Sequence, residues 1–84
     1  ETEKNIGRME KALEDEDMAG IAGMSHKLLP LLTLIGAGNI LPLLSWLEAR
    51  RDDNISDEAK QKTEAVLPLL RLVVEEARKY LLNS

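Results

Sequence analysis

Apolar residues recur along most of this chain at the three- and four-residue spacing that gives an α-helix one apolar face. Four stretches carry the pattern: residues 2–14, 17–35, 39–51 and 56–82. β-Branched and aromatic residues are sparse, whereas Leu, Ala, Glu and Lys dominate, and this composition also favours helix. We therefore predict an all-α fold in which four helices with short connections pack as an antiparallel, up-down-up-down four-helix bundle.

Local signals predict where these helices begin and end. Asp17 is placed to cap the second helix, and Gly36 is placed to end it. Asn39 is a candidate cap for the third helix and Ser56 for the fourth. The acidic run at residues 14–17 is either a binding patch or the junction of two helices. The junction is favoured, because four charges are fewer than the block that signals a charged tail.

The length and composition are those of one small domain with an aliphatic core. The 84 residues include one Trp, one Tyr and no Phe, so Leu, Ile, Val and Met must fill the interior. We treat residues 1–84 as a single helical domain. Because the chain starts at Glu1 rather than at Met, we expect the domain to come from a longer chain, either cut out of it or lacking an upstream helix.

Charge and residue counts argue against several classes of function. A net charge of −4 disfavours nucleic acid binding, which needs clustered Lys and Arg. The absence of cysteine excludes disulfides, thiol catalysis and cysteine-based metal sites, and it is compatible with the cytoplasm. No apolar run approaches the roughly 18 residues that a membrane span needs, so we expect no direct membrane contact.

The only histidine, His26, lies on the second predicted helix, opposite its apolar stripe. The stripe consists of Ile21, Ser25, Leu28, Leu32 and Ile35. A solvated helix face is usually covered by Lys, Glu and Arg. The residues near His26 on the helical wheel are instead neither long nor charged: Ala19, Ala22, Gly23, Pro30 and Thr33. We interpret this bare surface as the place where a partner approaches the histidine.

The spacing around this histidine resembles the signature of histidine-containing phosphotransfer (HPt) domains, which is His-x-Leu-Lys-Gly followed by Gly-Ala. His26 and Leu28 match its start, and Gly36-Ala37 matches its end. A helix that contains Leu47-Glu48 follows, as in that family. The resemblance runs from about Leu13 to the long final helix.

The resemblance implies a phosphocarrier and not an enzyme. His26 would accept a phosphoryl group from an aspartate of a response-regulator receiver domain and pass it to another receiver. The receiver would supply the aspartate and Mg²⁺, so we expect no cofactor or metal of the domain's own. Lys27 is the candidate for steering the phosphate. The candidate docking residues are Ala19, Ala22, Gly23, Leu29, Pro30 and Thr33, of which Leu29 and Pro30 stand where the family has Lys and Gly.

Two other functions fit parts of the sequence. The dimerisation and phosphoacceptor domain of a sensor histidine kinase has a Ser-His-Glu-x-x-x-Pro motif, which Ser25-His26 and Pro30 resemble. Here the proline comes one residue early, and Lys27 stands where the acidic general base should be. The third function is that of a helical adaptor, which would use the same surface without carrying phosphate.

The remaining polar residues predict no further chemistry. Glu48, Asp52 and Asp53 are close in sequence, but they imply no cleft of convergent polar groups for hydrolysis. His26 has no second strong ligand at metal-binding spacing. Since four helices can bury one another's stripes, we expect a monomer. We place it in the cytoplasm, either free or at the cytoplasmic end of a membrane-bound sensor kinase.

Overall fold

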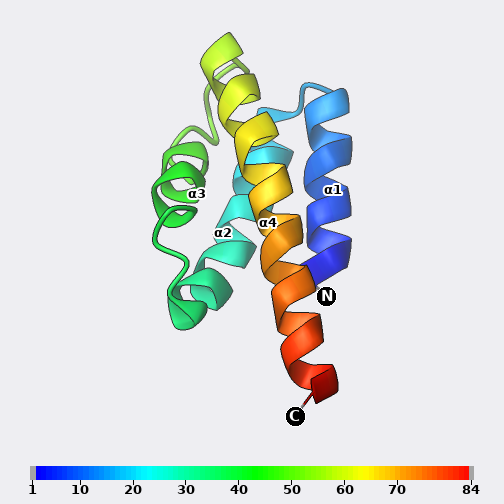
Figure 1. Cartoon of the computed structure of the whole chain (residues 1–84). Coiled ribbons are helices and arrows are strands. Elements are labelled where there is room, and N and C mark those ends of the chain that lie inside the picture. The colour runs from blue at the N-terminus through cyan, green and yellow to red at the C-terminus, as the bar shows by residue number, and fades with distance from the viewer. Residues whose placement is uncertain (1, 84) are drawn as a thin grey trace.

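Four α-helices make up the structure, a computed structural model that describes residues 2–83 and the side chains of residues 3–79. The helices are α1 (Thr2–Glu14), α2 (Met18–Ile35), α3 (Leu41–Glu48) and α4 (Asp57–Asn83), and residues 2–83 contain no strand (Figure 1). α2 packs against α1 and α3, and α4 packs against the same two helices. The helices therefore enclose one core in a molecule of 44 × 21 × 18 Å, and the all-α prediction is confirmed.

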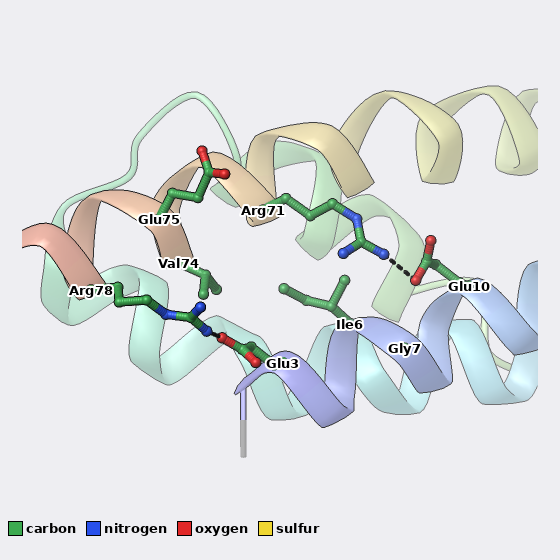
Figure 2. A pocket seen from close by; sticks show the side chains of 8 residues that line it. All are labelled: Glu3, Ile6, Gly7, Glu10, Arg71, Val74, Glu75 and Arg78. Carbon is green, nitrogen blue, oxygen red and sulfur yellow. Dashed lines mark hydrogen bonds and ion pairs between the residues drawn. The ribbon is translucent and has the colours of Figure 1, made fainter.

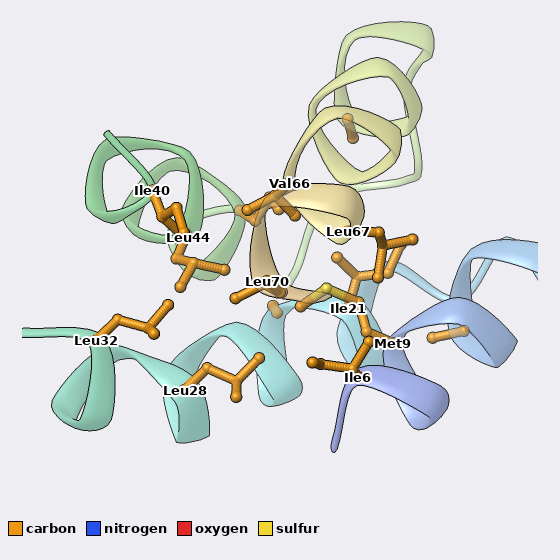
Figure 3. Close-up of a cluster of buried hydrophobic side chains, with 14 of the residues drawn as sticks. Ile6, Met9, Ile21, Leu28, Leu32, Ile40, Leu44, Val66, Leu67 and Leu70 are labelled. Carbon is orange, nitrogen blue, oxygen red and sulfur yellow. The ribbon is translucent and has the colours of Figure 1, made fainter. Parts of the chain in front are cut away.

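The core is aliphatic, as the composition predicted, and side chains from every helix contribute to it (Figure 3). The largest fully buried hydrophobic side chains are Ile6, Met9, Ile21, Leu28, Leu32, Ile40, Leu44, Leu47, Val66 and Leu70. Burying one such side chain stabilises the fold by about 1.5–3 kcal/mol. Two hydroxyl groups lie among them, and each donates a hydrogen bond to a carbonyl one turn earlier. Ser25 Oγ lies 2.9 Å from the Ile21 oxygen, and Thr63 Oγ1 lies 2.8 Å from the Ala59 oxygen.

Caps at the predicted positions define the ends of α2 and the start of α4. Oδ1 of Asp17 accepts a hydrogen bond from the backbone N–H of Gly20 at 3.0 Å. Gly36 ends α2 with φ at 83°, a left-handed conformation that costs glycine little because it has no Cβ. Oγ of Ser56 accepts from the N–H of Ala59 at 3.1 Å. The helix that carries His26 is thus fixed at both ends.

The start and end of α3 differ from the prediction. Ile40, and not Asn39, occupies the N-cap position, and no side chain caps the helix there. The Ile40 side chain is fully buried, which stabilises by about 1.5–3 kcal/mol, whereas a capping hydrogen bond contributes about 1 kcal/mol. Core packing therefore sets the register. The helix ends at Glu48, so residues 50–51 lie in the turn that follows it.

The acidic run between α1 and α2 forms the junction of the two helices. Asp17 caps α2, and Asp15 lies 3.5 Å from the Lys11 ammonium group. Glu16 turns the chain with φ at 54°, and its carboxylate lies 2.5 Å from Nζ of Lys60 at the start of α4. Three of the four acidic residues therefore have a local structural role, which favours the junction over a binding patch.

The hydropathy of α2 corrects the expectation that no segment reaches the length of a membrane span. α2 has 18 residues and a mean hydropathy of 1.4. By length and composition alone, it is therefore long and apolar enough to cross a membrane. The adjacent His26 and Lys27 interrupt the apolar run, but the apolar residues around them keep the mean hydropathy of the helix high. Such a helix is weak evidence of a span, because the core helix of a soluble protein passes the same test. The buried side chains of α2 are part of the hydrophobic core that the helices share.

Candidate functional site

His26 lies on the exposed face of α2, opposite the side chains that enter the core. Its side chain is 66% exposed. Ser25, Leu28 and Leu32 are fully buried on the other face. This orientation follows from the sequence, because residues at helical spacing share one face and His26 falls outside the buried set. The phosphoacceptor candidate is therefore accessible to a partner.

Glu48, the last residue of α3, holds one edge of the imidazole ring. Its Oε1 atom lies 2.5 Å from Nδ1 of His26, and its side chain is 34% exposed. An ionised carboxylate only accepts hydrogen bonds, so in the neutral ring this contact places the proton on Nδ1 and leaves a lone pair on Nε2. Nε2 has no hydrogen-bond partner within the described part of the chain. The ring is thus oriented by one nitrogen and available at the other.

The contact between His26 and Glu48 was not predicted from the sequence. The two residues are 22 positions apart, and only the packing of α3 on α2 brings them together. The family resemblance marked Glu48 as part of the following helix and gave it no role. A usable signal exists, because Leu44 and Leu47 define the buried face of α3 and Glu48 lies at its edge, four residues after Leu44.

The surface around His26 consists of small or uncharged side chains, with one correction to the prediction. Three docking candidates are exposed: Ala19, Pro30 and Thr33. Two others, Gly23 and Leu29, are half-buried. Ala22 is fully buried. It lies only about 40° round the helix from His26, yet the packing of the helices covers it. Ala22 is a packing residue, and a docking partner would not reach it.

Lys27 and Thr33, the two polar α2 residues among the predicted site residues besides His26, differ in what they offer a partner. Lys27 is exposed and forms no ion pair with any residue between 3 and 79. Thr33 Oγ1 donates its hydrogen to the backbone oxygen of Leu29 at 2.8 Å. The ammonium group of Lys27 is therefore available to an anion, whereas the Thr33 hydrogen is already used.

The end of α2 carries two exposed apolar side chains. Leu34 is 85% exposed and Ile35 is 51% exposed. The prediction that Ile35 belongs to the buried stripe is wrong. Ile35 is the last residue of α2. The helical wheel gives only the direction of its side chain and not whether a neighbouring helix extends far enough to cover it. Both side chains lie about two turns beyond His26.

A groove of about 430 Å³ lies elsewhere, between the first half of α1 and the second half of α4 (Figure 2). Its lining residues are Glu3, Ile6, Gly7, Glu10, Arg71, Val74, Glu75 and Arg78. Arg71 pairs with Glu10, and Arg78 pairs with Glu3, across the groove. None of the predicted site residues lines it. Since most of its charges are paired within the protein, the groove has the character of a helix–helix seam.

The side chains that commonly bind metals do not gather at one place in the described residues. Among them, no three His, Cys, Asp or Glu side chains are grouped closely enough to hold an ion. The carboxylate nearest to His26 serves its ring nitrogen as a hydrogen-bond acceptor.

Comparisons with known proteins assign no family to the chain. No family model, no curated protein and no solved structure matches it. The function therefore has to be inferred from the geometry around His26 and from the motif in which this histidine lies.

Proposed function

We propose that this domain is a phosphorelay carrier of the HPt type, which accepts a phosphoryl group on His26 from a receiver-domain aspartate and passes it to a second receiver. The observation that carries the proposal is an exposed, unique histidine whose Nδ1 is held by Glu48. An imidazole nitrogen with a lone pair is a competent nucleophile toward phosphorus. The match of Leu28 and Gly36-Ala37 to the HPt signature supports the same function.

We also infer that the four helices form an antiparallel, up-down-up-down bundle. Each helix packs against its neighbours in sequence, and α4 packs back against α1. The two chain ends lie at the same end of the molecule in Figure 1. His26 faces Glu48, while Gly23, three residues earlier, faces Arg51, three residues later. Opposed numbering of this kind supports an antiparallel α2–α3 pair, which presents His26 on its outer side.

In the proposed transfer, Nε2 of His26 attacks the phosphorus atom of the receiver's phosphoaspartate. The N–P bond forms as the bond from phosphorus to the aspartate oxygen breaks, and the carboxylate leaves with the electron pair. The proton on Nδ1 stays in place, so the product is a phosphoimidazolium. Glu48 stabilises the positive charge that the ring acquires. Transfer to the second receiver runs through the same steps in reverse.

The proposed partner is a receiver domain that must bring its aspartate within bonding distance of His26. Phosphoryl transfer depends mainly on positioning and charge stabilisation, so close approach is the first requirement. The small side chains of Ala19 and Gly23 allow it, and the exposed Leu34 offers apolar contact area. The receiver would contribute Mg²⁺. The carrier itself would act as a cytoplasmic monomer.

The two alternative functions make different demands on the same residues. A kinase dimerisation domain is a two-helix hairpin that a second chain completes, whereas here four helices of one chain share a core. That domain also needs an acidic residue after the histidine, where this chain has Lys27. An adaptor would use the surface around His26 but would leave the imidazole unmodified. The orientation of the ring by Glu48 favours the carrier.

The test is to incubate the domain with a panel of phosphorylated receivers and to follow the label. The proposal predicts transfer to the domain, with a label that is acid-labile and alkali-stable, as a phosphoramidate should be. A receiver that binds without transferring would indicate the adaptor. A dimer in sedimentation that is phosphorylated only by a kinase's ATP-binding domain would indicate the kinase function.

A further inference from the structure

Arg51, in the turn after α3, reaches across to the same face of α2 that carries His26. A Cβ atom built on Gly23 would lie 4.0 Å from a terminal guanidinium nitrogen of Arg51. Gly23 is three residues before His26, and side chains at that spacing lie about 5–6 Å apart on a helix. The guanidinium group is therefore held within about one helical turn of the imidazole ring.

Gly23 leaves the backbone of α2 bare beside this guanidinium group. Apart from the Arg51 nitrogen, a Cβ at this position would meet no other heavy atom within 4 Å, so the glycine does not serve a tight helix–helix contact. Glycine inside a helix costs about 1 kcal/mol relative to alanine. A bare backbone at this position leaves open the space between the Arg51 guanidinium and the α2 surface.

The charge of Arg51 is not used inside the protein. The guanidinium forms no ion pair or side-chain hydrogen bond with any residue from 3 to 79. The nearest acidic residue on α3, Glu48, is engaged with His26. The adjacent Arg50 behaves differently. Its guanidinium stacks on the ring of Trp46, 4.2 Å from the ring centroid, and Lys62 lies 5.0 Å from the same centroid.

From this arrangement we propose that Arg51 binds the phosphoryl oxygens when the group is transferred to and from His26. The inference rests on the phosphocarrier function proposed above and adds a residue to that site. A guanidinium group presents a planar fork of N–H donors that matches two phosphoryl oxygens. Preorganised cations at a transferring phosphoryl group stabilise the charge that develops in the transition state.

Arg51 would supply a cation for the phosphoryl oxygens on the His26 face of α2, which the other residues near His26 do not. Leu29, three residues after His26, is apolar and packs against the core. Lys27 is exposed but lies about 100° round the helix from His26. Arg51 forms no covalent bond in the reaction. It only contacts the oxygens as the bond from phosphorus to the aspartate breaks and the bond to Nε2 forms.

The test compares Arg51→Ala with its matched control, Arg50→Ala. Both variants remove one positive charge from adjacent positions, but only Arg51 lies beside Gly23. We expect Arg51→Ala to lower the single-turnover rate of transfer from phosphorylated receiver at least tenfold and Arg50→Ala to change it less than twofold. Arg51→Lys should give an intermediate rate, because it keeps the charge and loses the fork.

Two further measurements separate phosphoryl binding from a general effect. The affinity for unphosphorylated receiver should be equal in the two alanine variants, since the Arg51 contact is made to the phosphoryl group. Melting of Arg51→Ala should match wild type. If wild type is labelled and both alanine variants transfer at the same rate, whether wild-type or reduced, the role of Arg51 is disproved and the carrier function stands. If no receiver labels wild type, the carrier function itself fails, and the role of Arg51 fails with it.

Discussion

The seam between α1 and α4 and the seam between α2 and α3 use their charged residues in opposite ways. Across the first, acidic groups at the α1 side meet basic groups of α4 in three pairs: Glu3 with Arg78, Glu10 with Arg71, and Glu16 with Lys60 (Figure 2 shows the first two). Surface pairs of this kind contribute little to stability, because solvent screens them. Their main effect here is that each of these cations is already paired with a carboxylate and is not available to a ligand.

Along the second seam, one carboxylate meets the only imidazole, and two cations remain unpaired within the described residues. Glu48 holds His26, while Lys27 and Arg51 form no ion pair. The same fold therefore has one edge where most charges are paired within the protein and another where two cations have no partner among residues 3–79. This contrast, more than any single residue, is why we propose that the functional face lies on α2 and α3.

Removing the imidazole should have the largest effect on the functional seam. In His26→Gln, transfer of label from a phosphorylated receiver should be abolished. Because the side chain is exposed, the free energy of unfolding should change by no more than about 0.5 kcal/mol. Label retained by a folded His26→Gln variant, or label that resists acid, would place the phosphoryl group on another residue.

Adding a negative charge beside the histidine should have the next largest effect. In Gly23→Glu, the new carboxylate would pair with Arg51 and repel the phosphoryl group, so the single-turnover rate should fall at least tenfold, equivalent to about 1.4 kcal/mol. The matched control is Gly23→Ala, which should transfer nearly as wild type and melt slightly higher. Wild-type transfer by a folded Gly23→Glu variant would mean that the docking face lies elsewhere.

Removing the Glu48 carboxylate that orients the His26 ring should slow transfer by a smaller factor. In Glu48→Ala, Nδ1 of His26 loses its acceptor, so the ring can rotate and the proton can occupy either nitrogen. We expect the single-turnover rate to fall about threefold to tenfold, while circular dichroism stays unchanged. Glu10→Ala, which breaks a pair of the other seam, serves as the control and should leave the rate unchanged. Equal rates in Glu48→Ala and wild type would remove Glu48 from the mechanism.

The pH dependence of the structural seam should show the smallest effect. The hydrogen bond and the charge of Lys60 lower the pKa of Glu16 below its ordinary value of 4.5, and those of Glu16 raise the pKa of Lys60 above 10.5. The pair thus stabilises the fold at pH values between the pKa of Glu16 and the pKa of Lys60. Its contribution is lost as pH falls through the lowered Glu16 pKa or rises through the raised Lys60 pKa.

The Glu16→Gln variant tests this window. Its melting temperature should lie slightly below that of wild type between about pH 5 and pH 10, and the difference should vanish in more acidic solution. Glu16 is exposed and Lys60 is only half-buried, so the difference should be small. Transfer to His26 should not change. A difference that grows in acid would contradict the sign of the Glu16 shift.

Local sequence signals predicted the helices well because each signal acts within one turn. Asp17, Gly36 and Ser56 cap or end helices where their side-chain chemistry and backbone freedom indicate. The prediction failed at Asn39, where burial of Ile40 in the core outweighs a cap. Propensity and capping thus locate the helices, and packing decides the exact first residue.

The functional seam was predictable only on the α2 side. The helical period gave the outward orientation of His26, because period alone fixes the angle of a side chain. It did not reveal that Ala22 is buried, that Glu48 reaches Nδ1, or that Arg51 reaches Gly23. These facts depend on how two helices align, and no residue within one turn of His26 encodes that alignment.

Nitrogen-15 NMR of the imidazole in the phosphorylated domain tests the central claim most directly. Because the chain has one histidine, labelled imidazole gives only the two ring nitrogen signals of His26. After transfer from a phosphorylated receiver, we predict coupling of phosphorus to Nε2, with Nδ1 still protonated and its signal shifted in Glu48→Ala. Phosphorus on Nδ1, or unchanged ring signals in a domain that carries the label, would contradict the assignment of His26 as a phosphoacceptor oriented by Glu48.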